Sequence, residues 1–359
     1  MSYKNAIFVG KRRIAIDEPT YFIADIAANH DGNLERAKKL IYLAKEAGAD
    51  CAKFQHFLAD KIVSDYGFKH LKTGQSHQAN WKKSVWETYD EYHCKREWTA
   101  ELVKTCKDAE IDFMTTPYDF DAINEVDDYV NAYKIGSGDI TWLDFIKKIT
   151  SLNKPYFLAC GASSLEDVKR AVDFATEVNP QIILMQCNTN YTASLDNYKY
   201  INLNVLKTFA KMYPEMILGL SDHTFGCATV LGAVTLGARV IEKHFTDDNQ
   251  REGPDHKFAM NPTTWRNMVD RTRELELALG DGIKKVEDNE KDTVIVQRRS
   301  ICLKRDMKKG EILTNADLDI LRPSPEGAFL PFEINDVIGK SLNVDKVKGD
   351  SLYKGEINA

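Results

Sequence analysis

The chain has 359 residues, of which 43% are hydrophobic and 28% are charged, the composition of a globular protein with room for one large domain and a small one. Its formal net charge of -6 argues against binding nucleic acid through bulk charge, while leaving room for a local basic pocket that holds a small anion. No apolar run approaches the ~20 residues of a membrane span, so no membrane partner is expected.

The N-terminal stretch MSYKNAIFVGKRRIAID has no uninterrupted apolar segment and no small-residue cleavage site, so we expect no signal peptide. The seven cysteines are scattered and form no CxxC pair. We interpret them as reduced thiols of a cytoplasmic protein and assign them no catalytic role.

Short apolar runs alternate with amphipathic stretches along most of the chain. Eight of these runs predict strands, at residues 22–27, 51–57, 112–117, 132–137, 156–160, 182–187, 217–223 and 239–245. Helical patterns lie between them and are clearest at 34–48, 163–178 and 263–280. Eight strands, each followed by a helix, predict an α/β fold with a (β/α)8 barrel over residues 1–282. A doubly wound open sheet is the alternative, because spacing alone does not distinguish an open sheet from a closed one.

Two connections between these elements are long. Residues 58–97, which are rich in tryptophan and tyrosine, follow the second strand. We interpret them as an oligomer contact or a packing element, with a lid over the site as the alternative. Residues 246–260 follow the last strand and are dense in charge.

The pattern changes after Gly282. Residues 283–297 are polar and predict a linker. Residues 298–359 contain short β segments separated by turn signals. We therefore expect a separate, small β-rich domain at the end of the chain.

Polar side chains interrupt the apolar strands near their carboxyl ends. They are Asp25, Lys53, Gln55, Thr115, Thr116, Lys134, Ser137, Ser221, His223, Glu242 and His244. The active sites of such barrels lie at the carboxyl ends of the strands, and residues two apart on a strand point to one face. Glu242 and His244 should therefore face the barrel mouth. Lys243 should point the opposite way, into a structural ion pair with the helix layer.

The same rim offers groups for a metal ion and for an anion. His223 and His244 come from adjacent strands and are able to share one divalent ion, unless each is instead bonded to a nearby carboxylate. Lys53, Lys134 and the hydroxyl groups supply cations and donors for a phosphate or a carboxylate. A phosphate-bearing acid fits this rim better than a neutral ligand.

Several stretches of the sequence together resemble the sialic acid synthase family. They are ADIAANHDGNLERAKKLI, AGADCAKFQ, TTPYD, YKIGSGD, GLSDHTFG, GARVIEKHFT and GPDHKFAM, and they extend across the whole predicted barrel. The segments RRS, KKGE, LRPSPEG and IGK resemble that family's antifreeze-like (SAF) domain, over residues 298–359.

The resemblance implies a reaction in which phosphoenolpyruvate and an N-acylated hexosamine give a nine-carbon 2-keto acid and phosphate, with cleavage of a C–O bond. It implies a divalent ion, Mn2+ or Mg2+, on His223 and His244, where the ion polarises the sugar aldehyde. N-acetylmannosamine is the default acceptor, and a 2,4-diacetamido-trideoxyhexose is the alternative.

The resemblance also assigns roles to residues. The catalytic ones are Asp25, Glu242, His223 and His244. Those expected to hold phosphoenolpyruvate are Lys53, Thr116, Lys134, Ser137, Thr189 and Ser221. Those expected to face the sugar are Gln55, Tyr191, Asp255 and Arg322. In the family the antifreeze-like domain caps the barrel of a partner subunit, which implies a domain-swapped homodimer with Arg322 acting in trans.

This sequence departs from the family pattern at three places. Asp25 stands where the family usually has a glutamate, which sets the carboxylate about 1.5 Å further back. Thr192 stands where a proline is expected, and in this loop Thr189 falls at the phosphate-contacting position, with Asn188 or Asn190 as alternatives. His56 replaces a threonine, and we interpret it as an outward residue packed under a helix.

Three other functions compete with this one. A Schiff-base aldolase on the same barrel would use Lys53 or Lys134 as its nucleophile. Condensation with an aldose phosphate would give a shorter keto acid, although the C-terminal domain argues against it. A non-enzymatic carbohydrate- or ice-binding protein would use the tail alone, and the set of rim residues argues against it.

Overall fold

The computed structural model describes residues 3–72, 78–79 and 81–358. Within them the chain divides into two compact units, Met1–Gly280 and Asp281–Ala359. No helix of the described residues is long and apolar enough to cross a membrane.

Eight parallel strands of the described residues close into a barrel in the first unit. They are β3 (Tyr21–Asp25), β4 (Cys51–His56), β5 (Asp112–Pro117), β6 (Tyr133–Ile135), β7 (Tyr156–Ala159), β8 (Ile182–Cys187), β9 (Ile217–Asp222) and β10 (Ala238–His244). β10 pairs with β3, which closes the sheet and excludes the open-sheet alternative. The predicted α/β barrel is confirmed, and every predicted strand is present.

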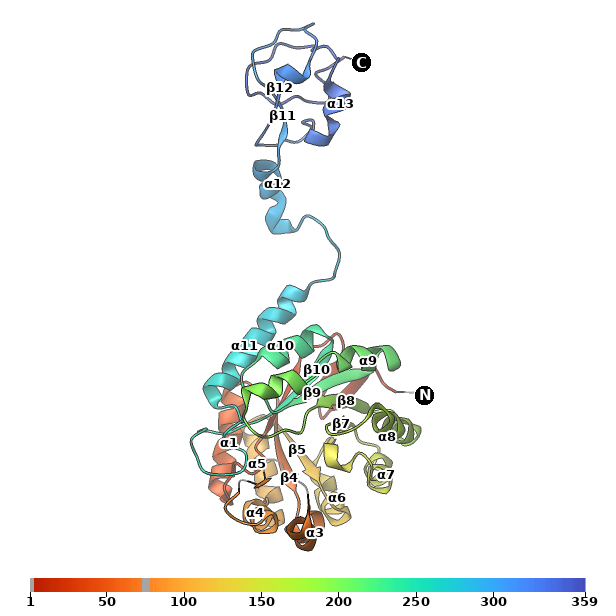
Figure 1. Ribbon diagram of the computed structural model, residues 1–359, viewed down its shortest axis with the longest axis vertical. Coiled ribbons are helices and arrows are strands. Elements are labelled where there is room, and N and C mark those ends of the chain that lie inside the picture. The colour runs from red at the N-terminus through yellow and green to blue at the C-terminus, as the bar shows by residue number, and fades with distance from the viewer. Residues whose placement is uncertain (1–2, 73–77, 80, 359) are drawn as a thin grey trace. The chain divides into compact units, whose positions relative to one another are not determined.

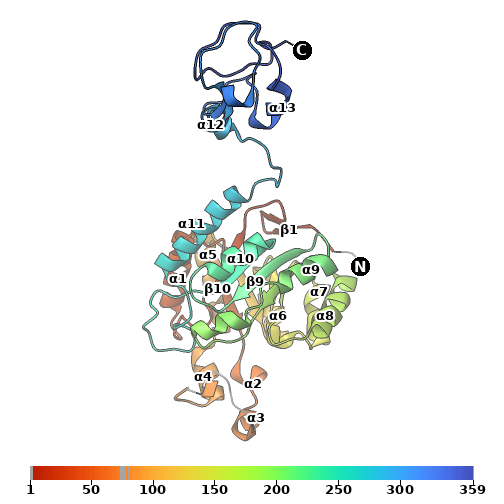
Figure 2. The same cartoon turned by 45° about the horizontal axis from the view of Figure 1, so that its top comes forward.

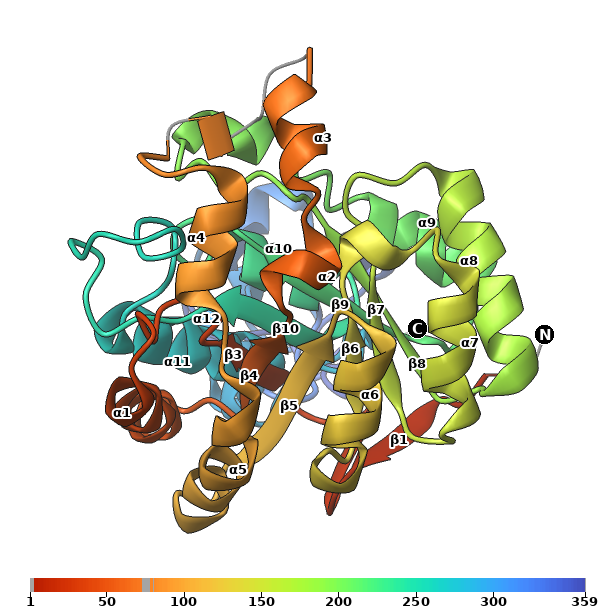
Figure 3. The same cartoon turned by 90° about the horizontal axis from the view of Figure 1, so that it is seen from below.

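Helices surround the barrel, as Figure 3 shows. They are α1 (Leu34–Glu46), α5 (Thr99–Asp108), α6 (Phe120–Val126), α7 (Leu143–Ser151), α8 (Leu165–Val178), α9 (Val205–Met212), α10 (Ala228–Thr235) and α11 (Pro262–Leu279). Each buries one apolar stripe against the outer face of the sheet. In α1 this stripe is Ala37, Leu40, Ile41 and Ala44.

A hairpin closes one end of the barrel, although the sequence pattern predicts no strand before residue 22. β1 (Ala6–Val9) and β2 (Arg12–Ala15) pair around a two-residue turn in which Gly10 has a φ of +56°. Ile7, Val9 and Ile14 pack with inward residues of the barrel strands in one buried cluster. Figure 2 shows β1 at one end of the barrel and α2 (Ala59–Ile62), α3 (Asp65–His70) and α4 (Val85–Tyr92) at the other.

The alternation along β10 separates two kinds of charge. Lys243 turns outward, is ion-paired with Asp222 of β9 and donates to the carbonyl of Thr224 at 2.6 Å. Thr229 of α10 donates to the same Asp222 carboxylate at 2.7 Å. The predicted outward direction of Lys243 and its structural ion pair are confirmed, but the anionic partner belongs to β9 and the helix layer contributes Thr229.

His56 is likewise structural. It is fully buried and outward, with Nδ1 2.7 Å from Thr115 Oγ1 and Nε2 2.8 Å from Thr99 Oγ1 at the start of α5. Both ring nitrogens are therefore used in packing a helix on the sheet. The prediction of a residue packed under a helix is confirmed.

The second unit has its own core. β11 (Ser300–Leu303) pairs antiparallel with β12 (Leu318–Leu321), and apolar side chains including Ile301 and Leu342 cluster around them, together with α13 (Ile334–Val337). Residues 283–297, expected to be a linker, contain the short helix α12 (Lys291–Gln297), visible in Figure 1. The carbonyl of Ile295 accepts from the Ser324 amide at 2.8 Å, so this segment is bonded to the domain that it precedes.

We predict that Ile14→Ala lowers the free energy of unfolding by about 2–5 kcal/mol, because it opens a cavity in the cluster beneath the barrel. Ile14 is 1% exposed, whereas Ile16, just beyond the same strand, is 46% exposed. Ile16→Ala is therefore the matched control, and it should change stability little. Chemical denaturation of both variants measures the difference, and equal losses would contradict the assignment of the hairpin as a plug.

Candidate active site

Four buried charged side chains form a chain of ion pairs at the carboxyl ends of the strands. Lys53 Nζ lies 2.6 Å from Asp25 Oδ2 and 3.8 Å from Glu242 Oε1. Lys134 Nζ lies 2.6 Å from the same oxygen of Glu242. All four side chains are 5% exposed or less. The structure thus joins two predicted catalytic carboxylates to two predicted anion-binding lysines, which come from β3, β4, β6 and β10.

Glu242 is held in its ionised form. Burial raises its pKa, but Lys134 and Lys53 outweigh that effect and bring the pKa down to about 2. Ser221 donates to Oε1 at 3.1 Å, so Oε1 has several partners. The second oxygen, Oε2, is buried and has no hydrogen-bond partner in the described part of the chain. A buried carboxylate oxygen without a partner is costly, which suits a position that a substrate group completes.

Lys53 is held in its charged form. Burial lowers its pKa, but Asp25 and Glu242 outweigh burial and raise the pKa above its ordinary value. A Schiff-base nucleophile must be a neutral amine. This charge state argues against Lys53 as an aldolase nucleophile. The pKa of Asp25 shifts in the opposite direction to that of Glu242. Burial and the nearby Glu242 raise it, and they outweigh the lowering effect of Lys53.

Two of the side chains predicted to hold phosphoenolpyruvate, Ser137 and Thr189, lie beside Gly161. Ser137 Oγ accepts from the Gly161 amide at 2.9 Å. A Cβ built on Gly161 would lie 2.5 Å from the Thr189 methyl, 3.0 Å from Ser137 Oγ and 3.1 Å from the sulfur of Cys187. Gly161 therefore lets these three side chains pack against the backbone, where a larger residue would displace them. The signal for this packing in the sequence was a glycine directly after the fifth apolar run, residues 156–160.

The loop after β8 contains the three alternatives for the phosphate contact. Asn188 turns its amide to the carbonyl of Tyr200 at 3.2 Å, and Asn190 accepts from Thr192 at 2.6 Å. Both asparagine side chains thus take part in the structure of their own loop. Thr189 is the one that lies beside Ser137 and Gly161, which supports it as the phosphate contact. Thr116, on β5, accepts from Lys53 Nζ at 3.3 Å.

His223 and His244 lie next to each other at the same end of the barrel, with ring centroids 5.2 Å apart. His223 Nδ1 lies 2.8 Å from the carbonyl of Asn188, which only accepts, so Nδ1 carries the hydrogen and Nε2 carries a lone pair. His244 Nδ1 is buried and has no hydrogen-bond partner among the described residues. Its nitrogens are 3.7 Å from Asp25 and from Asp255, too far for a hydrogen bond.

Both imidazoles are neutral. Burial lowers the pKa of each to about 3, with His244 adding to the effect at His223 and Lys53 adding to it at His244. Neutral imidazole with a free lone pair is the form that binds a metal ion. No group of three histidine, cysteine, aspartate or glutamate side chains suited to a metal exists in the described ranges. Two imidazoles fit a divalent ion whose other positions are open to water and substrate.

A cavity of about 180 Å³ adjoins His244. Polar and aromatic side chains form most of its wall: Gln55, Gln78, Thr88, His244, Asp255, Phe57, Trp81, Tyr89, Tyr92, Tyr118 and Tyr191. Gln55 Nε2 donates to Asp25 at 3.1 Å, and Asp255 accepts from the Ala28 amide at 3.2 Å. Burial raises the pKa of Asp255 to about 6.

The sequence reasoning assigned no site role to several residues that lie beside the candidate site. Phe258 packs with its ring centroid 4.9 Å from that of His244 and 5.5 Å from that of Tyr191, and its signal was its place in the GPDHKFAM motif. The segment 58–97, expected at an oligomer contact, supplies Trp81, Tyr89 and Tyr92 to the cavity wall. Its residues 73–77 and 80 lie outside the described residues.

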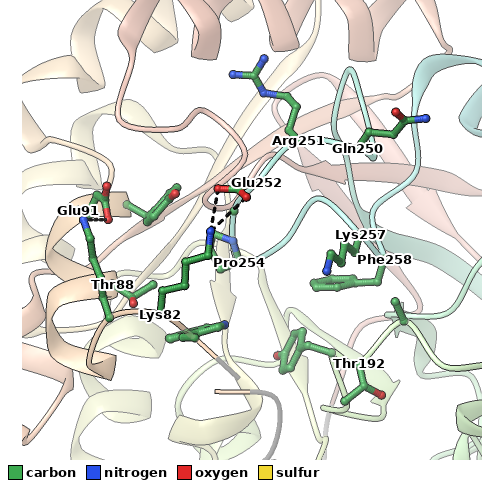
Figure 4. Close-up of a pocket in the computed structure, with 16 residues that line it drawn as sticks. Lys82, Thr88, Glu91, Thr192, Gln250, Arg251, Glu252, Pro254, Lys257 and Phe258 are labelled. Carbon is green, nitrogen blue, oxygen red and sulfur yellow. Dashed lines mark hydrogen bonds and ion pairs between the residues drawn. The ribbon is translucent and has the colours of Figure 1, made fainter. Parts of the chain in front are cut away.

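A wider cavity of about 680 Å³ adjoins the first and shares Trp81, Tyr92 and Tyr191 with it. Figure 4 shows charged side chains around this cavity, with Lys82 bonded to Glu252 across it at 3.2 Å. Arg322, the remaining predicted sugar contact, belongs to the second unit, where it is exposed.

We predict that Gly161→Ala weakens binding of phosphoenolpyruvate by roughly tenfold or more, because the added methyl group would lie 2.5 Å from the Thr189 methyl and 3.0 Å from Ser137 Oγ and would displace both side chains. Gly138 is the matched control, since a Cβ there meets nothing within 4 Å. Gly138→Ala should leave the affinity within about twofold. Titration calorimetry with phosphoenolpyruvate tests the pair, and equal affinities would remove Gly161 from the anion site.

Comparison with known proteins identifies the family. The NeuB family matches residues 40–284, and the SAF domain matches residues 298–358. The N,N'-diacetyllegionaminic acid synthase of Legionella pneumophila is 34% identical over 94% of this chain and 95% of its own length. The pseudaminic acid synthase of Campylobacter jejuni is 32% identical over 95% of this chain and 97% of its own.

A solved structure agrees with this assignment. The spore coat polysaccharide biosynthesis protein SpsE of Bacillus subtilis is 28% identical, with a TM-score of 0.64 and 99% of both chains covered. The resemblance inferred from the motifs is confirmed, and the non-enzymatic alternative is excluded. The chain belongs to the NeuB family of phosphoenolpyruvate-condensing nonulosonic acid synthases, transferases that here carry a C-terminal SAF domain.

Proposed function

We propose that the protein condenses phosphoenolpyruvate with the open-chain aldehyde of an N-acyl hexosamine to give a nine-carbon 2-keto acid and phosphate. One observation carries this proposal. Two lysines and several hydroxyl-bearing side chains lie at the same barrel mouth as two neutral imidazoles. An anion site beside a carbonyl-activating site is what this condensation needs.

The reaction needs no oxidant or reductant. The C3 carbon of phosphoenolpyruvate bonds to the aldehyde carbon, and the aldehyde oxygen takes a proton and becomes a hydroxyl. Water adds to C2 and loses a proton, which gives a tetrahedral intermediate. The bond between C2 and the bridging oxygen then breaks, phosphate leaves with the proton of the C2 hydroxyl, and the oxygen from water becomes the keto oxygen.

The chain's own residues bind and orient the two substrates. Lys53 and Lys134 supply positive charge for the carboxylate and phosphate of phosphoenolpyruvate, and Thr116, Ser137, Thr189 and Ser221 supply hydroxyl groups. Glu242 keeps both lysines in place and offers Oε2 to the substrates. Gln55, Tyr191 and Asp255 face the acceptor, and Asp25 holds Lys53 and Gln55.

Family members are generally metal-dependent, and we propose that His223 and His244 hold Mn2+ or Mg2+. When bound, the ion supplies Lewis-acid polarisation of the aldehyde oxygen. The free nitrogen of His244 and the low pKa values of both rings support this assignment.

The cavity wall favours one acceptor over the other. Phe57 packs against Tyr89 and Tyr118 with ring centroids 5.2 and 5.9 Å apart, so aromatic rings gather on this side of the cavity, beside the hydroxyl groups of the two tyrosines. Hydroxyl groups buried against such a wall lose hydrogen bonds to water, whereas methyl and acetyl groups pack well. We therefore propose a 2,4-diacetamido-trideoxyhexose rather than N-acetylmannosamine.

The aldolase alternative is disfavoured by the ion pairs of both candidate lysines, 2.6 Å for Lys53 with Asp25 and 2.6 Å for Lys134 with Glu242. We further propose that the second unit caps the barrel of a partner subunit in a domain-swapped homodimer. Seven free cysteines, six of them buried, support a reducing cytoplasmic location.

We predict that phosphate release from phosphoenolpyruvate needs both Mn2+ and one N-acyl hexosamine, and stops with EDTA. His244→Ala should abolish turnover, because it removes the free ring nitrogen at the centre of the site. His56→Ala is the matched control, since His56 is a buried histidine that faces the helix layer. Phosphate assays and product mass across a panel of sugars test this, and near-normal turnover by His244→Ala would contradict the metal assignment.

We also predict that Arg322→Ala raises KM for the acceptor by roughly tenfold, by removing a charge-assisted hydrogen bond to the acyl group. Arg298→Ala, at an exposed arginine of the same unit, should stay within about twofold. Mixing Arg322→Ala with His244→Ala chains should restore activity if Arg322 acts in trans. Mixed chains no more active than their parts would refute the swapped dimer.

A further inference from the structure

A charged cluster joins the loop after the first barrel strand to the loop after the last one. One oxygen of the Asp31 carboxylate lies 2.8 Å from His256 Nε2, within hydrogen-bonding distance. The other oxygen of Asp31 accepts from Arg251, with Nη2 at 2.7 Å and Nε at 2.9 Å. Arg36 Nε lies 3.1 Å from that second oxygen. We call Asp31, Arg251 and His256 the Asp31 clamp.

His256 is fixed from all sides. Its side chain is fully buried, and Nδ1 lies 2.7 Å from Thr246 Oγ1 at the start of the same loop. Asn249 donates to the His256 carbonyl at 2.9 Å. A Cβ on Gly253 would lie 2.6 Å from the imidazole, so the chain passes directly over the ring. The loop 246–260 is therefore folded around His256 and tied through it to Asp31.

The clamp lies next to the site but does not belong to the machinery described above. Asp255, one residue before His256, accepts from the Ala28 amide at 3.2 Å and lies 3.7 Å from His244 Nδ1. Ala28 is tied in turn to Asp31, whose amide donates to the Ala28 carbonyl at 3.0 Å. The hydrogen bond that places Asp255 is thus tied to the clamp on both sides. Asp255 is next to His256 in sequence, and Ala28 is bonded to Asp31.

We infer that Asp31 and His256 are positioning residues that hold Asp255 against the acceptor sugar. This inference rests on the proposed function, in which Asp255 faces the acceptor and not phosphoenolpyruvate. Loss of the Asp31 charge would leave Arg251 and the imidazole without their anionic partner. The loop would then gain freedom where Asp255 projects, while the anion site on β4, β5 and β6 would stay intact.

Asp31→Asn tests this inference, because it keeps the size of the side chain and removes its charge. We expect KM for the acceptor to rise roughly tenfold, while KM for phosphoenolpyruvate stays within about twofold. Glu252→Gln is the matched control in the same loop. Its pair with Lys82 is exposed, at 88% and 84% of the two side chains, and should matter little (Figure 4).

Rescue separates positioning from simple stability. His256→Gln keeps a donor near the Nε2 position and should retain more acceptor affinity than His256→Ala. The double variant Asp31→Asn with His256→Ala should lose less than the product of the single losses, because both act through one contact. A melting temperature that falls while KM for the acceptor is unchanged would overturn the inference, as would equal rises in both KM values.

A second measurement does not depend on turnover. Asp31→Asn should speed hydrogen exchange at amides of residues 246–260 relative to the native protein, and Glu252→Gln should not. If the native protein releases no phosphate with any sugar, the proposed function fails, and the clamp is then judged by exchange alone. Unchanged exchange in Asp31→Asn would overturn it.

Discussion

The chain of buried ion pairs from Asp25 through Lys53 and Glu242 to Lys134 is the interaction on which the site depends. A single charge inside the barrel would be uncompensated, and removing one member of a buried pair costs about 3–5 kcal/mol. Because the four charges come from different strands, they meet only when the barrel has closed. Closure of the sheet between β10 and β3 is therefore also what assembles the site.

The alternation of side chains along each strand divides chemistry from architecture. Glu242 and His244 face the barrel mouth, while Lys243 between them is paired with Asp222 beneath α10. The same division separates Lys53 from His56, whose ring is bonded to Thr115 and Thr99. Ionisable residues of one short segment thus have unrelated roles. A side chain that points into the barrel mouth belongs to the site, and one that points outward supports the packing of a helix.

The two halves of the proposed reaction draw on different properties of the mouth. The anion side is built from fixed charges, with Glu242 ionised and Lys53 protonated, and needs little rearrangement to hold a phosphate. The acceptor side combines neutral imidazoles with an aromatic wall, and much of it comes from two long loops. Differences in acceptor between members of one family are reasonably sought in such loops, since they vary without disturbing the barrel.

The sequence by itself determined the strands and helices, the inward direction of Glu242 and His244 and the family, because period-two polarity and ordered motifs are local properties of the chain. Closure of the sheet was decided by the pairing of β10 with β3. The sequence did not reveal the β1–β2 hairpin, whose strands are four residues each and draw their stability from the barrel above them. The tertiary structure alone decided that Thr189 and not its neighbours lies beside Ser137, that Tyr89 faces the cavity, and that Asp31 bonds His256. These contacts join residues far apart in sequence, and their distances follow from how the loops pack and from no pattern within any one segment.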